Sequence, residues 1–501
     1  MNIKFLLISI SVLSFCLNFN VKGQDYLDYA QIFSQREISG SARMQGMGGA
    51  STSLGGDLTS TIGNPAGLGF FNRSEFSFSP SLGFHNSEFQ SGELNSSDYE
   101  TNFNFGNVGV VLNNTKRNTS EAWKGGSFGI SMTRINDFYF KGSVPDFESD
   151  ESFINFSVDY LNNGGPIDIA DLAYETYLVN EFFDEGNLYD ENGDTIFFYD
   201  QDVIPIDNPD DLNKPISNRQ SEQFTSSGAT YETTFAYGGN FNDKLYVGAS
   251  VGFVNIDYEL ERRYTETPLN PDAYLDYFTL YDRRSIEGSG VNLSLGLIYK
   301  PVNELAIGLS YSSPTFYNIE ERSNPIVSAY YKDSNTPYES SLPFAYDFEL
   351  RTPSTYNAGA TYFFGKNGFI TADVEYVNYS KNHYSSNDNA FEETNQFINA
   401  NFNNRSLNYK VGGEYRFNIF RVRAGYAFFD DPTDDSLGDG VDRSRQSVSI
   451  GGGIRLPKYY IDVAVINTMY ESNYLPIYNG GFSTAFDNSS TRAMLTVGFN
   501  F

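Results

Sequence analysis

Alternation of apolar with polar or small residues dominates the chain from residue 73 to the last residue. In one such run, Val291, Leu293, Leu295 and Leu297 alternate with asparagine, serine and glycine. Because successive side chains of a strand point to opposite faces, a period of two predicts strands with one apolar face. Runs of this kind, ended by turn-forming residues, are predicted at 73–84, 102–112, 127–134, 230–240, 244–261, 291–300, 305–312, 348–364, 369–379, 405–417, 420–429, 446–456, 459–468 and 491–501.

The connections between the predicted strands are of two kinds. Those after the fourth, sixth, eighth, tenth and twelfth strands are only a few residues long. Those after the third, fifth, seventh, ninth, eleventh and thirteenth run from about a dozen to about 90 residues, and such short turns opposite long loops are typical of an outer-membrane barrel. A soluble sandwich also alternates, but it lacks this asymmetry. An even number of antiparallel strands can also close without a free edge.

Aromatic residues bracket the short turns, which is typical of the girdle where amphipathic rings lie at a membrane interface. The chain stops at Phe501, in phase with the apolar face. This resembles the terminal aromatic signal of barrels inserted into the outer membrane of Gram-negative bacteria. The sequence therefore predicts an all-β fold, an antiparallel transmembrane β-barrel of 14 strands. The predicted girdle comprises Phe241, Tyr246, Phe364, Phe369, Phe417, Phe420, Tyr459 and Tyr460.

One predicted strand, at 244–261, changes phase along its length. Its apolar set moves from odd positions such as Val251 and Phe253 to the even positions Val254 and Ile256. Two interpretations remain open: a β-bulge near Phe253, or a strand that leaves the membrane there.

Residues 1–23 have the pattern of a cleaved secretory signal peptide, with an apolar core and a small-residue cleavage site. Cys16, the only cysteine, lies in this segment, so the mature chain offers neither disulfides nor thiolate ligands. After Phe19 no run of 18 apolar residues occurs, which excludes helical membrane spans. The formal charge of −30 argues against nucleic acid as a partner.

The segment before the predicted barrel has nine glycines between Gly40 and Gly69 and little aromatic bulk. Glycine allows close backbone approach and positive φ. The segment therefore suits either a compact hatch inside the barrel or a flexible linker. Residues 24–38 are expected to form a short amphipathic helix, with Tyr26, Tyr29, Ile32 and Phe33 on one side. The predicted domains are the signal peptide, a hatch at 24–72 and a barrel at 73–501.

The glycine-rich segment ends in Asn-Pro-Ala-Gly at residues 64–67, directly before the predicted barrel. This arrangement resembles the long-chain fatty-acid transporter (FadL) family, which includes aromatic-hydrocarbon channels, and residues 40–57 look like its Bacteroidetes version. The resemblance implies passive uptake of hydrophobic molecules through the lumen, with exit through a lateral opening or a remodelled hatch. No ligand-pocket residue of the family can be matched by position. Only the hatch or gate residues are carried over, namely Asn64, Pro65, Ala66, Gly48, Gly49 and Asp57.

The chemistry of the Asn-Pro pair predicts an anchor. Pro65 fixes its own φ and pushes Asn64 toward an extended conformation. We therefore expect the Asn64 side chain to hydrogen-bond a backbone group that the lumen would otherwise leave unpaired.

The connection at 144–227 holds 20 of the 63 acidic residues and only two basic ones, and it is expected outside the cell. Asp190, Asn192 and Asp194 have the spacing of the first calcium ligands of a loop, although the chain does not continue as an EF-hand. A solvated acidic loop is the favoured interpretation, and a structural calcium is the alternative. No other cofactor is expected. Residues 168–183 are predicted to be helical, with an apolar side that serves either ligand capture or ordinary packing.

Basic residues in the inward phase of the last strands are expected in the lumen. The favoured interpretation pairs them with acids such as Glu414 or Asp57. The alternative is that they meet a carboxylate substrate. These candidate lumen charges are Lys410, Arg416, Arg421, Arg423, Arg455 and Arg492.

Catalysis has little support in the sequence. His85 and His383 are placed at outer strand ends, where histidines are usually surface residues. The glycines at 46–49 lack the lysine and serine or threonine of a phosphate loop. We therefore expect no enzyme.

The leading hypothesis is a monomeric outer-membrane channel, surrounded by lipid, for hydrophobic small molecules such as long-chain fatty acids. The alternative is a non-transport barrel that binds or shuttles protein substrates in a secretion machine.

Overall fold

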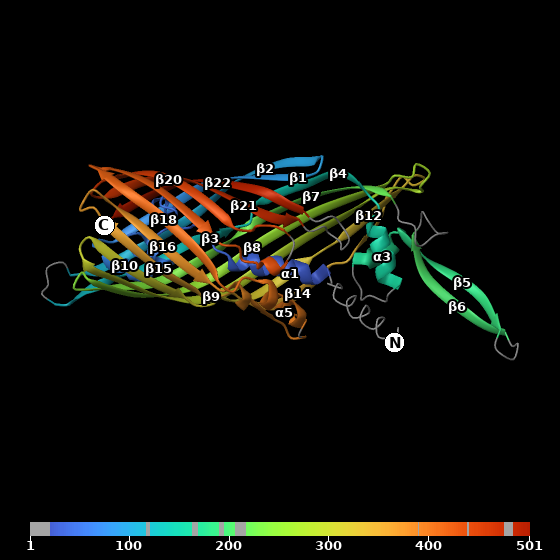
Figure 1. Cartoon of the computed structure of the whole chain (residues 1–501), viewed down its shortest axis with the longest axis horizontal. Coiled ribbons are helices and arrows are strands. Elements are labelled where there is room, and N and C mark those ends of the chain that lie inside the picture. The colour runs from blue at the N-terminus through green and yellow to red at the C-terminus, as the bar shows by residue number, and fades with distance from the viewer. Residues whose placement is uncertain are drawn as a thin grey trace, which may run out of the picture.

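Fourteen antiparallel barrel strands form a closed β-barrel in the computed structural model (Figure 1). Because some of them are interrupted and consist of two or three labelled strands, each of the fourteen is here called a stave. The structure describes residues 21–116, 121–162, 169–189, 195–205, 217–388, 390–437, 440–474 and 484–501. Neighbouring staves pair in chain order, and β1 (Glu75–Ser91) pairs with both β2 (Leu94–Thr115) and β22 (Thr484–Asn500), which closes the sheet.

The other staves follow around the barrel, and some consist of more than one strand. They are β3 (Trp123–Asp137) continued by β4 (Phe140–Ser149); β7 (Asn218–Phe241); β8 (Leu245–Pro268); β9 (Leu275–Val302); β10 (Leu305–Ser312), β11 (Phe316–Ser323) and β12 (Ile326–Tyr331); β13 (Tyr338–Ser341), β14 (Phe344–Arg351) and β15 (Thr355–Phe363); β16 (Gly368–Val377) continued by β17 (His383–Ser385); β18 (Ser406–Phe417); β19 (Phe420–Phe429); β20 (Arg445–Arg455); and β21 (Tyr459–Tyr474).

The outward faces are apolar, as the alternation predicts. On β9, Val291, Leu293, Leu295 and Leu297 are all exposed, and Phe501 is 70% exposed. Several staves are longer than predicted: β7 and β8 have 24 residues each and β9 has 28. Their outward faces turn polar beyond the apolar band, so the period-two apolar signal stops before the strand does.

The change of phase in β8 is not caused by a β-bulge. β8 pairs with β7 and with β9 in continuous register through Phe253, so the bulge interpretation was wrong. Val254 and Ile256 face inward and are buried, while Asn255 faces outward and is exposed. The outward face leaves the apolar band at this point, and the inward face becomes apolar because it packs against a helix inside the barrel.

The predicted girdle was wrong for three of its eight members. Tyr246, Phe369 and Tyr460 are buried side chains that point into the lumen, and Tyr460 is 2% exposed. Neighbouring residues of a strand face opposite ways, so Tyr459 and Tyr460 cannot both face the membrane. The outward members are Phe241, Phe364, Phe417, Phe420 and Tyr459.

The acidic insertion is more structured than a loop. β4 extends the third stave along β7, and α3 (Phe153–Asn162) and α4 (Ile169–Glu175) pack on the ends of β8, β9 and β12 through an apolar cluster. The predicted helix at 168–183 ends early, because β5 (Val179–Tyr189) follows and pairs with β6 (Thr195–Pro205). Leu172 and Leu178 are buried in that cluster, which supports ordinary packing. The proposed calcium ligands Asp190, Asn192 and Asp194 lie outside the described residues.

Helical elements complete the fold. α1 (Val21–Ser34) lies within the barrel, with Tyr29 and Phe33 buried among inward residues of the wall, as the amphipathic pattern predicts (Figure 1). Tyr26 and Ile32 pack against the same cluster. Among the described residues, no helix is long and apolar enough to cross a membrane. The other helical elements are α2 (Ala42–Gln45), η2 (Leu58–Thr61), η3 (Pro65–Phe70), η4 (Tyr379–Lys381), α5 (Glu392–Asn401) and η5 (Asp435–Leu437).

Candidate functional site

Residues 40–72, here called the lumenal segment, lie directly against the inner wall at the end of the barrel that carries the short turns. Ten inward glycines on ten different staves receive it, because a Cβ at any of them would contact or overlap residues 46–68. We call these glycines the glycine seat. They are Gly109, Gly129, Gly238, Gly248, Gly296, Gly308, Gly359, Gly412, Gly425 and Gly451.

The predicted gate glycines form part of this close approach. Gly48 has a φ of +64°, and a Cβ on it would come within 2.9 Å of the Tyr426 backbone. Its N–H donates to Ser449 Oγ at 3.0 Å. Gly49 has a φ of +74° and lies against Ile38. Both positions therefore require glycine for conformation, and Gly48 also requires it for space.

Asn64 anchors the segment to the wall. Its Nδ2 donates to the Thr52 carbonyl at 2.7 Å and to the carbonyls of Leu297 and Leu309 at 3.2 Å each. Its Oδ1 accepts from the N–H of Ala66 at 3.1 Å, which caps the turn that Pro65 begins. The expected bonds to backbone groups are therefore present, and they join the segment to β9 and β10.

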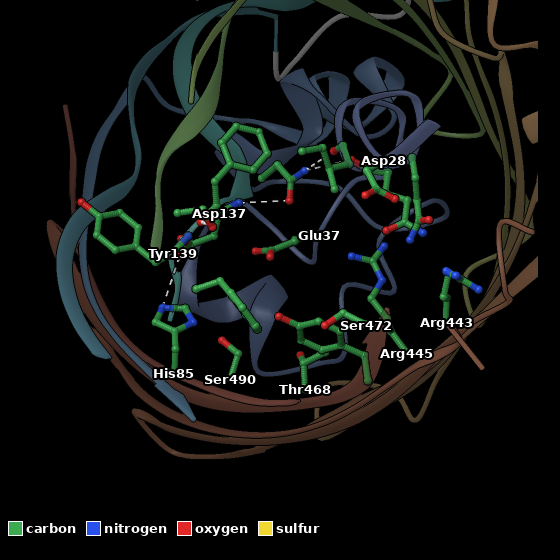
Figure 2. A pocket seen from close by; sticks show the side chains of 18 of the residues that line it. Asp28, Glu37, His85, Asp137, Tyr139, Arg443, Arg445, Thr468, Ser472 and Ser490 are labelled. Atoms are coloured by element: carbon green, nitrogen blue, oxygen red, sulfur yellow. Dashed lines mark hydrogen bonds and ion pairs between the residues drawn. The ribbon is translucent and has the colours of Figure 1, made fainter. Parts of the chain in front are cut away.

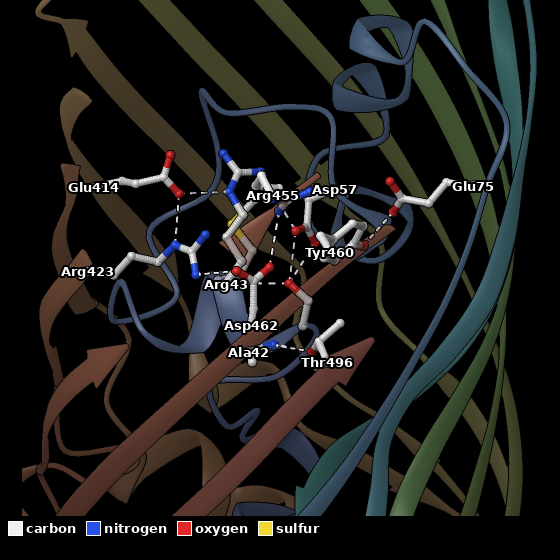
Figure 3. A network of polar contacts seen from close by, with 12 residues as sticks. Ala42, Arg43, Asp57, Glu75, Glu414, Arg423, Arg455, Tyr460, Asp462 and Thr496 are labelled. Carbon is white, nitrogen blue, oxygen red and sulfur yellow. Dashed lines mark hydrogen bonds and ion pairs between the residues drawn. The ribbon is translucent and has the colours of Figure 1, made fainter. Parts of the chain in front are cut away.

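A buried network of ion pairs also holds the segment (Figure 3). Arg43 lies 3.4 Å from Glu414 and 3.7 Å from Asp57. Arg423, with a side chain that is 0% exposed, pairs with Glu414 at 2.8 Å and with Asp462 at 2.7 Å. Ser41 Oγ and the Thr59 N–H donate to Asp57, and Arg416 and Arg455 complete the network on Glu414 and Asp462.

The other candidate lumen charges lie apart from this network. Lys410 pairs with Glu375 at 3.4 Å, and Arg492 pairs with Glu37. The Arg421 guanidinium donates to backbone carbonyls of the turn after β18, so it lies at the barrel rim. The six predicted basic residues therefore do not form one carboxylate site.

A cavity of about 300 Å³ lies beyond the segment, toward the long-loop end of the lumen (Figure 2). α1 forms one wall with Tyr29 and Ile32, and the barrel contributes Tyr258 and Ile466. Apolar groups make up somewhat more than half of the lining, and charged side chains such as Glu37 and Asp137 face the cavity as well (Figure 2). Its residues come from α1 and from strands distant in sequence, so the sequence alone did not reveal it.

Arg445 is the cavity residue best placed to meet a ligand. Its guanidinium lies 5.1 Å from the centroid of the Phe429 ring. Its only hydrogen bond in the described part of the chain runs to the Arg36 carbonyl at 3.4 Å, and its buried Nε has no partner there. It pairs with no described carboxylate, whereas Arg492 and Arg262 of the same cavity do. Arg445 is not among the basic residues that the sequence pattern predicts in the lumen.

A second charged cluster lines the opposite side of the cavity (Figure 2). The Asp137 carboxylate pairs with Arg134 at 2.7 Å and lies 3.8 Å from Arg492 and 3.9 Å from His85 Nε2. His85 is 9% exposed and lies within β1, so its placement at an outer strand end was wrong. β1 continues to Ser91 because its hairpin with β2 extends past the apolar band. His383, in β17, is exposed.

The barrel wall has a break beside this cluster. The ladder between β2 and β3 ends at the pair Asn107–Thr133. Beyond it, among the described residues, 94–106 of β2 pair only with β1, and 134–149 of β3 and β4 pair only with β7. We call this interval the wall gap.

Side chains bridge the wall gap in place of backbone bonds. Asn102 Nδ2 lies 3.3 Å from both oxygens of Asp137, and Ser143 Oγ donates to Asp98 at 2.6 Å. Phe103, 62% exposed, and Phe105 point outward beside the gap. These apolar neighbours place the gap at the level of the membrane.

A closed barrel with a filled lower lumen, a cavity above it and an apolar outer band defines a class: outer-membrane β-barrel channels. The outer membrane protein transport protein family (OMPP1/FadL/TodX) matches residues 220–493, and the chain belongs to that family. The protein is therefore an outer-membrane barrel of a family of transport channels for hydrophobic substrates, not of enzymes.

Solved structures show the same fold. The CymD monoaromatic hydrocarbon channel is 13% identical with a TM-score of 0.51, over 93% of this chain and 98% of that one. The Pseudomonas putida toluene transporter TodX is 15% identical with a TM-score of 0.50, over 92% and 98%. The Ralstonia pickettii toluene transporter TbuX is 14% identical with a TM-score of 0.50, over 93% and 99%. No curated protein sequence matches the chain.

Proposed function

We propose that the protein admits hydrophobic small molecules, long-chain fatty acids or similar compounds, by diffusion through the barrel lumen. The observation that carries the proposal is the cavity of about 300 Å³ above the lumenal segment. Ligand sites are concave and mostly apolar, with a few placed polar groups, and this cavity has that character. A space of this size suits a small molecule better than a protein substrate.

The position of Arg445 favours a ligand that carries a carboxylate at one end. A guanidinium presents a planar fork of donors that matches a carboxylate. The apolar residues Tyr29, Ile32 and Tyr258 would receive the chain of a fatty acid. A half-buried arginine with an unpartnered buried Nε, lying over a phenyl ring, is an arrangement that such an anion would complete.

The glycine seat bears on the route by which a ligand leaves the barrel. The glycine seat and the ion-pair network obstruct the lumen at the short-turn end, so the lumenal segment acts as the hatch and its anchor residues as the gate. A ligand in the cavity reaches the wall gap past His85 and Asp137, both of which line the cavity. We propose lateral exit there into the membrane, from a monomeric barrel.

Cavity filling tests the proposal. Ser490→Trp would place a large ring in the cavity, from a strand position whose side chain makes no hydrogen bond to the described residues. Arg445→Leu would remove the cation. The full chain would be produced in the outer membrane of a Gram-negative host that lacks such channels, and uptake of labelled palmitate measured. We expect Ser490→Trp to abolish uptake and Arg445→Leu to lower it about tenfold, because a hydrogen bond to a charged group contributes about 1.5–3 kcal/mol.

The matched control is Arg322→Leu, which removes an exposed arginine that pairs with Glu320 on the same strand. It should leave uptake unchanged. Heat-modifiable migration on gels would show that each variant forms a barrel. Wild-type uptake no greater than that of the empty host would refute the proposal.

A further inference from the structure

We infer that the end of the barrel that carries the short turns is a binding surface for anionic phospholipids. Its partners are the head groups of lipids in the leaflet at that end, which faces the periplasm, arranged as a ring around the barrel. This inference goes beyond the proposed function, because a lipid ring can form whether or not a ligand passes through the lumen.

This end of the barrel, marked C in Figure 1, has a charge opposite to that of the whole chain. We call it the short-turn rim, and it comprises residues 72–74, 116, 121–124, 241–245, 299–305, 364–368, 417–421 and 456–459. It carries eight basic and three acidic side chains, whereas the whole chain has 33 basic and 63 acidic residues. Each of the six turns contributes at least one basic residue. The basic residues are Arg73, Lys116, Lys124, Lys244, Lys300, Lys366, Arg421 and Lys458, and the acidic ones are Glu121, Asp243 and Glu304.

Outward-facing rings place the charges of the rim at the level of the lipid head groups. Phe364, 51% exposed, lies two residues before Lys366. Tyr459, 46% exposed, directly follows Lys458. Aromatic rings on the outer face of a barrel lie at the membrane interface. A lysine beside such a ring can lay its apolar stem along the protein while its ammonium group reaches the lipid phosphates.

The lysines without protein partners are spread around the whole rim. Lys244, Lys366 and Lys458 are exposed and make no side-chain hydrogen bond or ion pair with the described residues. They follow the fourth, eighth and twelfth staves. Arg73, before the first stave, donates to the Pro457 carbonyl. A protein partner would be matched by a patch on one side, whereas lipids surround a barrel on all sides, so this distribution favours lipid.

The remaining basic residues of the rim differ in how accessible they are. Lys116 and Lys124 pair with exposed carboxylates of the same rim. Ion pairs that reach solvent contribute little to stability, so lipid phosphates can compete for these two lysines. Lys300 lies over rings inside the barrel, and Arg421 bonds carbonyls of its own turn, so neither is assigned to the lipid ring.

The opposite end of the barrel carries the reverse charge on its outer face. Above the apolar band, outward-facing Asp257, Glu287 and Glu320 lie directly opposite one another on β8, β9 and β11. The arginines beside them, Arg283 and Arg322, already pair with glutamates. Carboxylates repel lipid phosphates, so the short-turn rim is the better site for an anionic lipid.

The unpaired lysines select for a lipid with a net negative charge. A lysine ammonium is a compact point charge with three donors, and phosphate oxygens accept from it. Phosphatidylglycerol keeps the negative charge of its phosphate, whereas the choline ammonium of phosphatidylcholine cancels it. Basic residues beside a membrane are attracted to the anionic lipid for this reason. Phosphatidylglycerol is therefore the probe and phosphatidylcholine its neutral reference.

The single tryptophan of the chain reports on lipid at the rim. Trp123 is 45% exposed on the outer face and lies between the rim residues Glu121 and Lys124. The purified barrel would be placed in vesicles of equal parts phosphatidylglycerol and phosphatidylcholine, with bromine near the head-group end of the acyl chains of one lipid or the other. Bromine quenches tryptophan fluorescence on contact, so the two mixtures show which lipid lies beside Trp123, whichever way the barrel inserts.

We expect the wild type to prefer phosphatidylglycerol about fivefold, the size of the attraction of one basic residue to an anionic surface. Lys124→Gln/Lys244→Gln, at Trp123 and on the neighbouring turn, should bring the preference close to one. The matched control, Arg322→Gln/Lys332→Gln, removes two exposed positive charges from the opposite end and should keep the wild-type preference.

Salt provides a second measurement on the wild type, in case the lysine variant does not form a barrel. Raising the salt from 0.1 M to 1 M shortens the screening length from about 10 Å to about 3 Å and should also bring the preference toward one. Equal quenching by the two lipids in the wild type at low salt would overturn the inference and indicate an acidic protein as the partner of the rim. A preference that persists in the folded lysine variant would overturn it as well. Neither result bears on palmitate uptake, so the proposed function fails or stands separately.

Discussion

The short-turn half and the long-loop half of the lumen differ in how their polar groups are paired. At the short-turn end, backbone lies on glycine, Asn64 bonds three carbonyls, and buried arginines and carboxylates pair with one another. At the long-loop end, α1 leaves a cavity, and Arg445, His85 and the gap residues keep polar atoms without partners in the described chain. Dense pairing suits a seal, although Arg423 Nη2, Gln45 Oε1 and Asp373 Oδ1 also lack partners in the described chain. A cavity lined by unpaired polar atoms suits a place where something else binds.

The largest expected effect comes from Glu414→Ala. The variant removes the carboxylate shared by Arg43, Arg416 and Arg423, and breaking a buried ion pair costs about 3–5 kcal/mol. We expect the lumenal segment to leave its seat, so that conductance in planar bilayers rises well above that of the wild type. Glu320→Ala, at an exposed pair, is the control. Wild-type conductance in the Glu414 variant would show that the network is not part of the seal.

A smaller effect is expected from Asn64→Ala combined with Pro65→Gly. The pair loses the Asn64 bonds to Thr52, Leu297 and Leu309, which together contribute about 1–3 kcal/mol. Conductance should rise in part, palmitate uptake should change, and the amount of barrel in the membrane should stay constant. If conductance and uptake both match the wild type at normal expression, the segment is a linker and not a hatch.

A matched glycine pair sharpens the test of the seat. A Cβ at Gly308 would overlap the Thr52 carbonyl, whereas at Gly452 the nearest atom, the Arg421 carbonyl oxygen, lies 3.7 Å away. Overpacking costs about 1–3 kcal/mol. We expect Gly308→Ala to lower the unfolding temperature and raise conductance slightly, and Gly452→Ala to do neither. If the two variants have equal unfolding temperatures and equal conductance, the lumenal segment does not depend on close packing at the glycine seat.

The smallest effect on conductance is expected from Phe33→Ala. Phe33 belongs to α1 and packs on Tyr29, Phe138 and Tyr258, away from the seat. The change should enlarge the cavity and alter palmitate uptake while conductance stays low. Both are measured on the same preparation. A rise in conductance equal to that of Glu414→Ala would show that the long-loop half of the lumen also contributes to the seal.

The barrel was predictable because its determinants are local. Lipid contact requires an apolar side chain at every second position, so β9 and β18 can be read from their own residues. Asn64 was predictable for a similar reason, since Pro65 beside it restricts its conformation. The Tyr459–Tyr460 pair shows the limit, because aromatic content was counted there without applying the alternation that had identified the strand.

The cavity and the wall gap could not be predicted in the same way. Inward positions tolerate polar residues throughout the barrel, so no period distinguishes Arg445 or Asp137 from their neighbours. Their meeting depends on which staves face each other across the lumen. One signal was available: His85 lies in the inward phase of β1, and extending that strand past Phe84 would have placed it in the lumen.

The glycine seat has a consequence for the order of assembly. The lumenal segment precedes β1 in the chain, yet it also bonds the last strand, where the Ala42 N–H donates to Thr496 Oγ1 at 2.8 Å. The contacts of the lumenal segment are therefore incomplete until β22 has joined β1. A barrel that closed first would have to be threaded afterwards through a lumen lined by its own side chains. Closure of the ring and capture of its N-terminal segment are thus expected to be a single cooperative step.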